Sequence, residues 1–183
     1  GQEYKIIALT TLALQEKETS EAYKLRAFAK QIYNYKQGLI EDINWVLNKN
    51  PQDSEALLLR ANAFANQARS GKWLLALDGY DEVISLGGKQ KALALINRGL
   101  FRIWVLKDLD GIMNINKAIE LEYNTAKAHL LKGYIYSSLQ EEDKAIQFFQ
   151  SNNLQVARFS CYILKPNVCT LVGRAASPPV ERL

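Results

Sequence analysis

The sequence predicts an all-α protein built from repeated pairs of helices, and an internal repeat is the main reason. In four similar segments of the chain a small residue directly follows a basic one. The small residues are Ala27, Ala61, Gly99 and Gly133, spaced by 34, 38 and 34 residues. Such a period accommodates two helices and their turns. With 183 residues, 48% of them hydrophobic, the chain is long enough for one domain with its own core.

A second pattern predicts the second helix of each pair. A small residue is followed four positions later by a bulky residue, and three positions after that by a smaller one. The members are Ala76, Tyr80 and Val83; Gly111, Ile115 and Ala118; and Ala145, Phe149 and Asn152. The first unit departs from the pattern, with Leu39, Ile43 and Val46, but it ends at Asn50-Pro51, where a proline stops a helix. Small residues let two helices approach closely, and bulky residues fill the gaps between neighbours.

These two patterns resemble the tetratricopeptide repeat (TPR) family of helical-repeat proteins, over residues 20 to about 150. The resemblance implies a right-handed α-solenoid of antiparallel helix pairs, a TPR-like superhelix in which each unit buries its apolar face against its neighbours. The chain also departs from the family. The aromatic residue that opens the motif remains only as Tyr23. Basic residues stand where the family usually has leucine, namely Arg26, Arg60, Arg98 and Lys132.

The expected elements follow in order along the chain. Residues 1–19 form an N-terminal capping helix or a partial repeat, because apolar residues recur densely between Tyr4 and Glu18. Four TPR-like repeats then occupy residues 20–53, 54–91, 92–125 and 126–153. The second repeat is extended, with its extra residues in a longer first helix or in the inner turn near Ser70-Gly71, and one more in the Gly87-Gly88 turn.

Residues 154–183 are expected to form a C-terminal cap and an irregular tail. Three of the four prolines and both cysteines of the chain lie after residue 150. Proline and glycine interrupt any regular element from Pro166 onward. This abrupt change in composition motivates the hypothesis that part of the tail is not native, which a comparison of the coding DNA with the source genome would test.

The net charge of +4 comes from 23 basic and 19 acidic residues, and most of it belongs to the tail. From residue 151 onward there are four basic residues and one acidic residue, a net charge of +3, which leaves +1 for residues 1–150. A helical-repeat RNA binder needs a basic groove, so we expect no nucleic-acid partner. No apolar run approaches the roughly 18 residues of a membrane helix, so we expect no membrane partner. A cytoplasmic location is favoured, with a removed signal peptide left open.

No group of residues forms a recognisable catalytic or metal-binding motif. His129 is the single histidine, and no second His or Cys stands three or four positions away to complete a metal-ligand pair. Cys161 and Cys169 are eight residues apart, which fits two free thiols or a bridge across a turn. Gly87-Gly88 lacks the residues of a phosphate-binding loop. We therefore expect no enzymatic activity, no metal and no cofactor.

Pairs of acidic residues recur in the second helices, and we expect them to be solvated or to cap helix N-termini rather than to act as catalytic acid and base. They are Glu41-Asp42, Asp81-Glu82 and Glu141-Glu142-Asp143.

The resemblance also implies a binding surface. In TPR folds the first helix of each pair lines a concave groove, and the positions three before and one after the small residue point into it. These positions are Lys24, Phe28, Leu58, Asn62, Ile96, Leu100, Leu130 and Tyr134. The set is largely apolar, which suits the burial of an apolar peptide face or a partner helix. Only Lys24 and Asn62 match the residues with which some TPR domains clamp a carboxylate tail, so no such clamp is expected. The alternative is that several of these side chains pack inside the helix stack.

The sequence thus predicts a non-enzymatic protein interaction module, a scaffold or adaptor whose groove binds a peptide or partner helix. A regulatory domain of a larger protein or enzyme is the alternative, and a helical-repeat RNA binder is the least favoured class. Weak self-association through the ends of the solenoid is a further expectation.

Overall fold

The computed structural model describes residues 2–121, 125–138 and 144, and this part of the chain is all-α, without strands. The all-α prediction is therefore confirmed for these residues. The elements are α1 (Gln2–Glu16), α2 (Ser20–Ile32), α3 (Leu39–Lys49), α4 (Ser54–Ala65), the short 3-10 helix η1 (Ala68–Ser70), α5 (Trp73–Leu86), α6 (Lys91–Trp104), α7 (Gly111–Glu120) and α8 (Thr125–Ser138).

Local sequence signals explain where several helices begin. Thr19 precedes α2, and its side chain accepts a hydrogen bond from the backbone N–H of Ala22. Asp53 caps α4 by accepting from the N–H groups of Glu55 and Ala56. Such caps satisfy backbone donors that have no partner within the helix itself.

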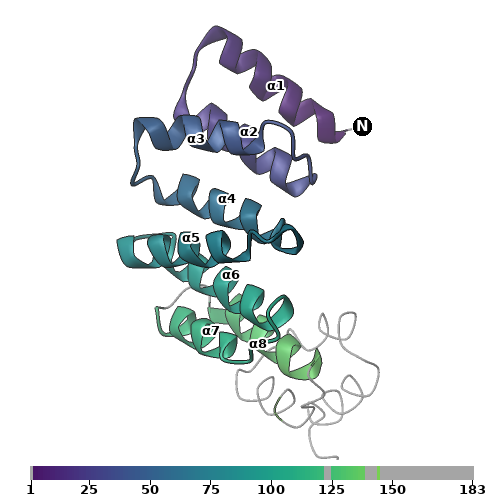
Figure 1. Cartoon of the computed structure of the whole chain (residues 1–183), viewed down its shortest axis with the longest axis vertical. Helices are drawn as coiled ribbons and strands as arrows, with labels where there is room; N and C mark the ends of the chain where they lie inside the picture. Colours follow the sequence, from purple (N-terminus) through teal and green to yellow (C-terminus); the bar gives the residue numbers. More distant parts are fainter. Residues whose placement is uncertain (1, 122–124, 139–143, 145–183) are drawn as a thin grey trace, which may run out of the picture. The chain divides into compact units, whose positions relative to one another are not determined.

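The chain divides into two compact units, residues 1–114 and 115–183. In the first unit consecutive helices pack on one another from α1 to α6, in the order of the sequence (Figure 1). Alternate helices also touch, because α2 contacts α4 and α4 contacts α6. Helices that are neighbours in sequence therefore build most of this unit.

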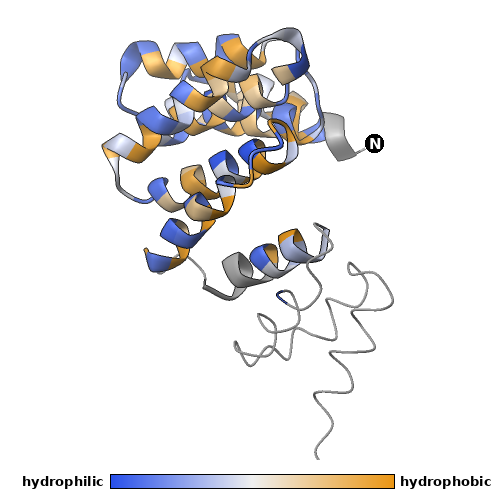
Figure 2. Ribbon diagram, turned by 60° about the horizontal axis from the view of Figure 1, so that its bottom comes forward, coloured by the Kyte–Doolittle hydropathy of each residue, from blue (hydrophilic) through white to orange (hydrophobic). Residues whose placement is uncertain are grey.

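The core of the first unit lies between these helices and contains the repeat positions. Ala27, Ala61, Ala76, Tyr80 and Val83 are all buried in it. Between α2 and α3, Tyr23 stacks on Trp45 with ring centroids 4.2 Å apart. Hydrophobic and hydrophilic residues alternate along the helices of this unit (Figure 2), as expected when one face of each helix packs inward.

Two glycines mark places where helices approach closely. A Cβ on Gly79 of α5 would lie 2.9 Å from the Cβ of Ala61 in α4, which is too close for ordinary contact. A Cβ on Gly111 would overlap the carbonyl oxygen of Gly99 in α6. Gly99 and Gly111 are both small positions of the predicted repeat, so close helix packing explains their size.

The turn between α4 and α5 is long enough to hold a short 3-10 helix. Helix α4 ends at Ala65, and η1 follows it. Gly71 then adopts a φ of 80°, a left-handed conformation that glycine tolerates best. The region around Ser70-Gly71 thus forms a turn that contains a 3-10 helix.

In the second unit the structure describes the end of α7, helix α8 and Lys144. Ile135 and Ser137 of α8 are buried. The predictions for Ala145, Phe149, Asn152, Cys161, Cys169, the acidic residues 141–143 and the tail 154–183 lie outside the described residues. So do the side chains of His129 and Leu130. Among the helices that are described, none combines the length and the hydrophobicity needed to cross a membrane.

Candidate binding surface on α2 and α4

A hollow of about 310 Å³ opens on the surface of α2 and the start of α4. Its lining residues are Glu21, Lys24, Leu25 and Phe28 of α2 and Glu55 of α4. Two of them, Lys24 and Phe28, are predicted groove residues. We call this region the α2–α4 hollow.

An exposed apolar stripe runs along α2 from the hollow. Leu25, Phe28 and Ile32 are each at least half exposed to solvent. Their spacing of three and four residues places them on one face of the helix. Each position alone would be unremarkable on a soluble protein, but an aligned set of three offers a continuous apolar contact surface.

The charged side of the hollow is organised around Lys24. Its Nζ lies 2.9 Å from Oε2 of Glu55 and 3.3 Å from Oδ2 of Asp53, so the ammonium links α2 to α4. Burial disfavours the charged form of Lys24, but the hydrogen bonds with Glu55 and Asp53 outweigh this effect and raise its pKa. Lys24 therefore stays protonated and is already occupied by two carboxylates.

Two predicted groove residues lie in the interior instead. Leu58 is 5% exposed and Ile96 is 7% exposed. Leu58 belongs to the core cluster of the first unit. For these two positions the structure agrees with the alternative interpretation, packing inside the helix stack, and neither is available to a partner in this conformation.

Asn62 holds three helices together. Its Oδ1 accepts a 2.8 Å hydrogen bond from the hydroxyl of Tyr80 in α5 and a 3.0 Å bond from Nδ2 of Asn97 in α6. Burial raises the pKa of Tyr80, so its hydroxyl stays protonated and continues to donate. Both lone pairs of Oδ1 are engaged in these bonds, so the expected role of Asn62 in binding the backbone of a peptide would fall to its Nδ2 group.

The remaining predicted positions are divided between the two units. Leu100 of α6 is partly exposed, and Tyr134 of α8 is exposed. Tyr134 belongs to the second unit, so only Lys24 and Phe28 are brought together in the hollow. Leu25, Ile32 and Glu55, which complete this surface, were not among the predicted positions.

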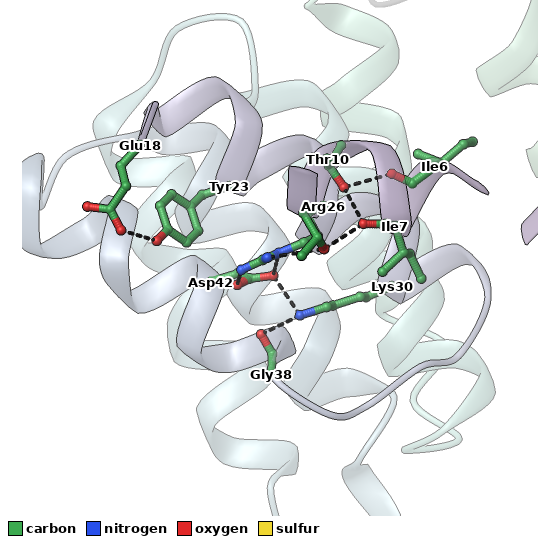
Figure 3. A network of polar contacts seen from close by, with 10 residues as sticks. Ile6, Ile7, Thr10, Glu18, Tyr23, Arg26, Lys30, Gly38 and Asp42 are labelled. Atoms are coloured by element: carbon green, nitrogen blue, oxygen red, sulfur yellow. Dashed lines mark hydrogen bonds and ion pairs between the residues drawn. The ribbon is translucent and has the colours of Figure 1, made fainter. Parts of the chain in front are cut away.

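A buried ionic network lies on the other side of α2, where α2 meets α3, and it corrects one sequence prediction. Asp42, expected to be solvated or capping, is only 3% exposed. It accepts hydrogen bonds from Nε of Arg26 at 2.9 Å and from Nζ of Lys30 at 2.8 Å (Figure 3). Lys30 also donates to the carbonyl of Gly38, and Arg26 reaches Oγ1 of Thr11 in α1. A carboxylate at this depth is stable only because two cations surround it.

Other basic residues of the repeat pair with acids in the same way. Arg60 of α4 lies 3.2 Å from Glu82 of α5, and Arg98 of α6 lies 2.9 Å from Asp81 of α5. These carboxylates are largely exposed, so the pairs are weaker than the one at Asp42. Arg60 and Arg98 each directly precede a small residue of the sequence pattern, and this position is the sequence signal for these pairs.

Comparison with known proteins identifies no relative, because no family model, no curated protein and no solved structure matches this chain. Within the described ranges, no three His, Cys, Asp or Glu side chains are grouped closely enough to hold a metal ion.

Proposed function

We propose that this chain is a TPR-like interaction module, in which α2 with α3 and α4 with α5 are antiparallel pairs of a right-handed solenoid. The contacts between consecutive helices support this architecture. So do the contacts of α2 with α4 and of α4 with α6, because the first helices of successive repeats are neighbours in such a stack. The tight packing of Gly111 on Gly99 agrees with the role of small residues in the repeat.

The proposed activity is binding of a peptide or partner helix at the α2–α4 hollow. One observation carries this proposal: predicted groove residues Lys24 and Phe28 line a surface hollow that continues into the exposed apolar stripe of α2. An apolar stripe of this kind favours a partner that presents its own apolar face, as in helix-in-groove recognition. Each of these side chains is already about half buried, so burying the rest contributes about 1 kcal/mol before the cost of ordering the partner.

A selection from a displayed random peptide library tests the proposal on the full chain. We expect enriched peptides to bind the wild-type protein and to lose at least about tenfold in affinity with Phe28→Asp, because the substitution places a charge on the apolar stripe. Leu74→Asp is the matched control, since Leu74 of α5 is 53% exposed and Phe28 is 51% exposed.

Both variants should retain the helical circular dichroism of the wild type, because both side chains are half exposed. Peptides that bind Phe28→Asp and wild type equally well would place recognition elsewhere and overturn the proposal. The same conclusion would follow if selection enriched no binding peptide.

A further inference from the structure

We infer that the α2–α4 hollow selects a cationic amphipathic segment, in which an apolar helical face is bordered by Lys or Arg. This inference rests on the proposed function and adds the chemical class of the partner. The charges around the hollow carry it.

Carboxylates outnumber ammonium groups at this site. Glu21 and Glu55 line the hollow, Asp53 lies beside it, and Lys24 is the basic residue among them. Three carboxylates against one ammonium give a net charge of −2. Glu21 is exposed and the side chain of Glu55 is 54% exposed, so both can meet a partner's basic side chain.

The engagement of Lys24 argues against an anionic partner. A carboxylate that approached Lys24 would find two of the three ammonium N–H donors engaged, by Glu55 at 2.9 Å and by Asp53 at 3.3 Å. It would also meet the repulsion of the acids that remain. Asp53 is further held by the N–H groups of Glu55 and Ala56, so its position is fixed by the start of α4. The arrangement thus opposes acidic peptides and nucleic acids and favours cations.

The apolar stripe sets the length of the complementary segment. Leu25 and Ile32 are seven residues apart on α2, which corresponds to about 10 Å along the helix axis. A partner helix would match this length with two turns, presenting apolar residues at positions i, i+3 or i+4, and i+7. Glu21 lies one turn before Leu25, so a basic residue at one end of that apolar face would come near it.

Three synthetic 14-residue peptides test the inference on the full chain. All share leucine at the same helical positions, and the other positions are lysine in the first, glutamine in the second and glutamate in the third. By fluorescence anisotropy at low ionic strength, we expect the Leu/Lys peptide to bind about tenfold more tightly than the Leu/Gln peptide. The Leu/Glu peptide should bind least. The advantage of lysine should shrink as salt screens the charges.

Reversing the charge of Glu21 tests whether the preference for the lysine peptide arises at the α2–α4 hollow. Glu21→Lys should weaken the Leu/Lys peptide about fivefold and leave the Leu/Gln peptide unchanged. Glu41→Lys is the matched control, because Glu41 is exposed on α3 and does not line the hollow, and it should change neither affinity.

The outcomes separate this inference from the proposed function. Equal binding of the Leu/Lys and Leu/Gln peptides, with both lost in Phe28→Asn, would overturn the cationic preference and leave the peptide site intact. The neutral substitution removes the apolar side chain without adding a carboxylate that would attract lysine. Peptides that fail to bind, or that bind Phe28→Asn normally, would overturn both. If light scattering detects self-association that Phe28→Asp removes, the surface serves a second copy of the chain, and the inference is wrong.

Discussion

Nζ of Lys30 donates a 2.8 Å hydrogen bond to Oδ2 of Asp42, and both side chains are buried where α2 meets α3. Arg26 completes the network from one turn earlier on α2. A buried carboxylate with two cationic partners fixes the register of the two helices, because a slide of either helix would leave a charge unpaired. The network therefore positions α2, the helix that also carries the exposed apolar stripe.

Replacing Asp42 tests how much this network contributes to the stability of the protein. We expect Asp42→Asn to lower the free energy of unfolding by about 3 kcal/mol, because the buried Lys30 and the partly buried Arg26 lose their counter-charge. Urea denaturation followed by circular dichroism measures this value. The control is Asp81→Asn, whose side chain pairs with Arg98 at the surface and should cost less than about 1 kcal/mol. If both substitutions lowered the free energy of unfolding equally, the buried network around Asp42 would contribute no more to stability than a surface ion pair.

Because α4 and α5 are in close contact at Gly79, we expect Gly79→Ala to destabilise the protein, the opposite of its usual effect in a helix. Glycine to alanine within a helix ordinarily stabilises by about 1 kcal/mol. Here the new Cβ would meet Ala61, so we expect Gly79→Ala to destabilise the chain by about 1–3 kcal/mol in urea denaturation. Adding Ala61→Gly should restore part of the loss, since it removes the opposing methyl group. A stabilising Gly79→Ala would contradict the close approach of α4 and α5.

Tyr80 predicts a dependence of stability on alkaline pH. Burial raises its pKa above the ordinary value of 10.0, so above pH 10 the unfolded chain loses this proton while the folded chain retains it. The contribution of Tyr80 to stability is full below pH 10 and falls as pH rises further. We expect Tyr80→Phe to be less stable than wild type at pH 7, by about 1 kcal/mol for the lost hydrogen bond to Asn62. The difference should narrow between pH 10 and 11 in urea denaturation, and a constant difference would contradict burial of the phenol.

A substitution of Asn62 distinguishes whether this residue stabilises the fold or binds a peptide. We expect Asn62→Ala to destabilise the chain by about 1–3 kcal/mol, because Tyr80 and Asn97 lose their acceptor. The affinity of a selected peptide, measured where the variant is fully folded, should stay within about twofold of wild type. A large loss of peptide affinity with unchanged stability would contradict this and indicate that Asn62 binds the peptide directly.

The repeat pattern made much of the first unit predictable from sequence. Small residues such as Ala27 and Ala61 must face neighbouring helices, and burial of Tyr80 and Val83 follows from the same spacing. Positions of this kind are determined locally, by helix periodicity and residue size.

The surface was less predictable, because it depends on how helices are rotated about their axes. Leu58 and Ile96 were predicted to line the groove, yet both are buried. The burial of Asp42 depends on Arg26 and Lys30, which are 16 and 12 residues away in sequence. The unusual basic residue at position 26 was a signal for this pair, but periodicity alone does not reveal which acid it meets.

The most direct test of the central claim is to map the bound Leu/Lys peptide by backbone amide chemical shifts of the full 15N-labelled chain. If the α2–α4 hollow is the binding site, the largest changes will fall on residues 21–32 of α2 and on the first turn of α4 around Glu55. The exposed faces of α3 and α5 should change little. Largest changes on α3 or α5, with α2 unaffected, would contradict the claim.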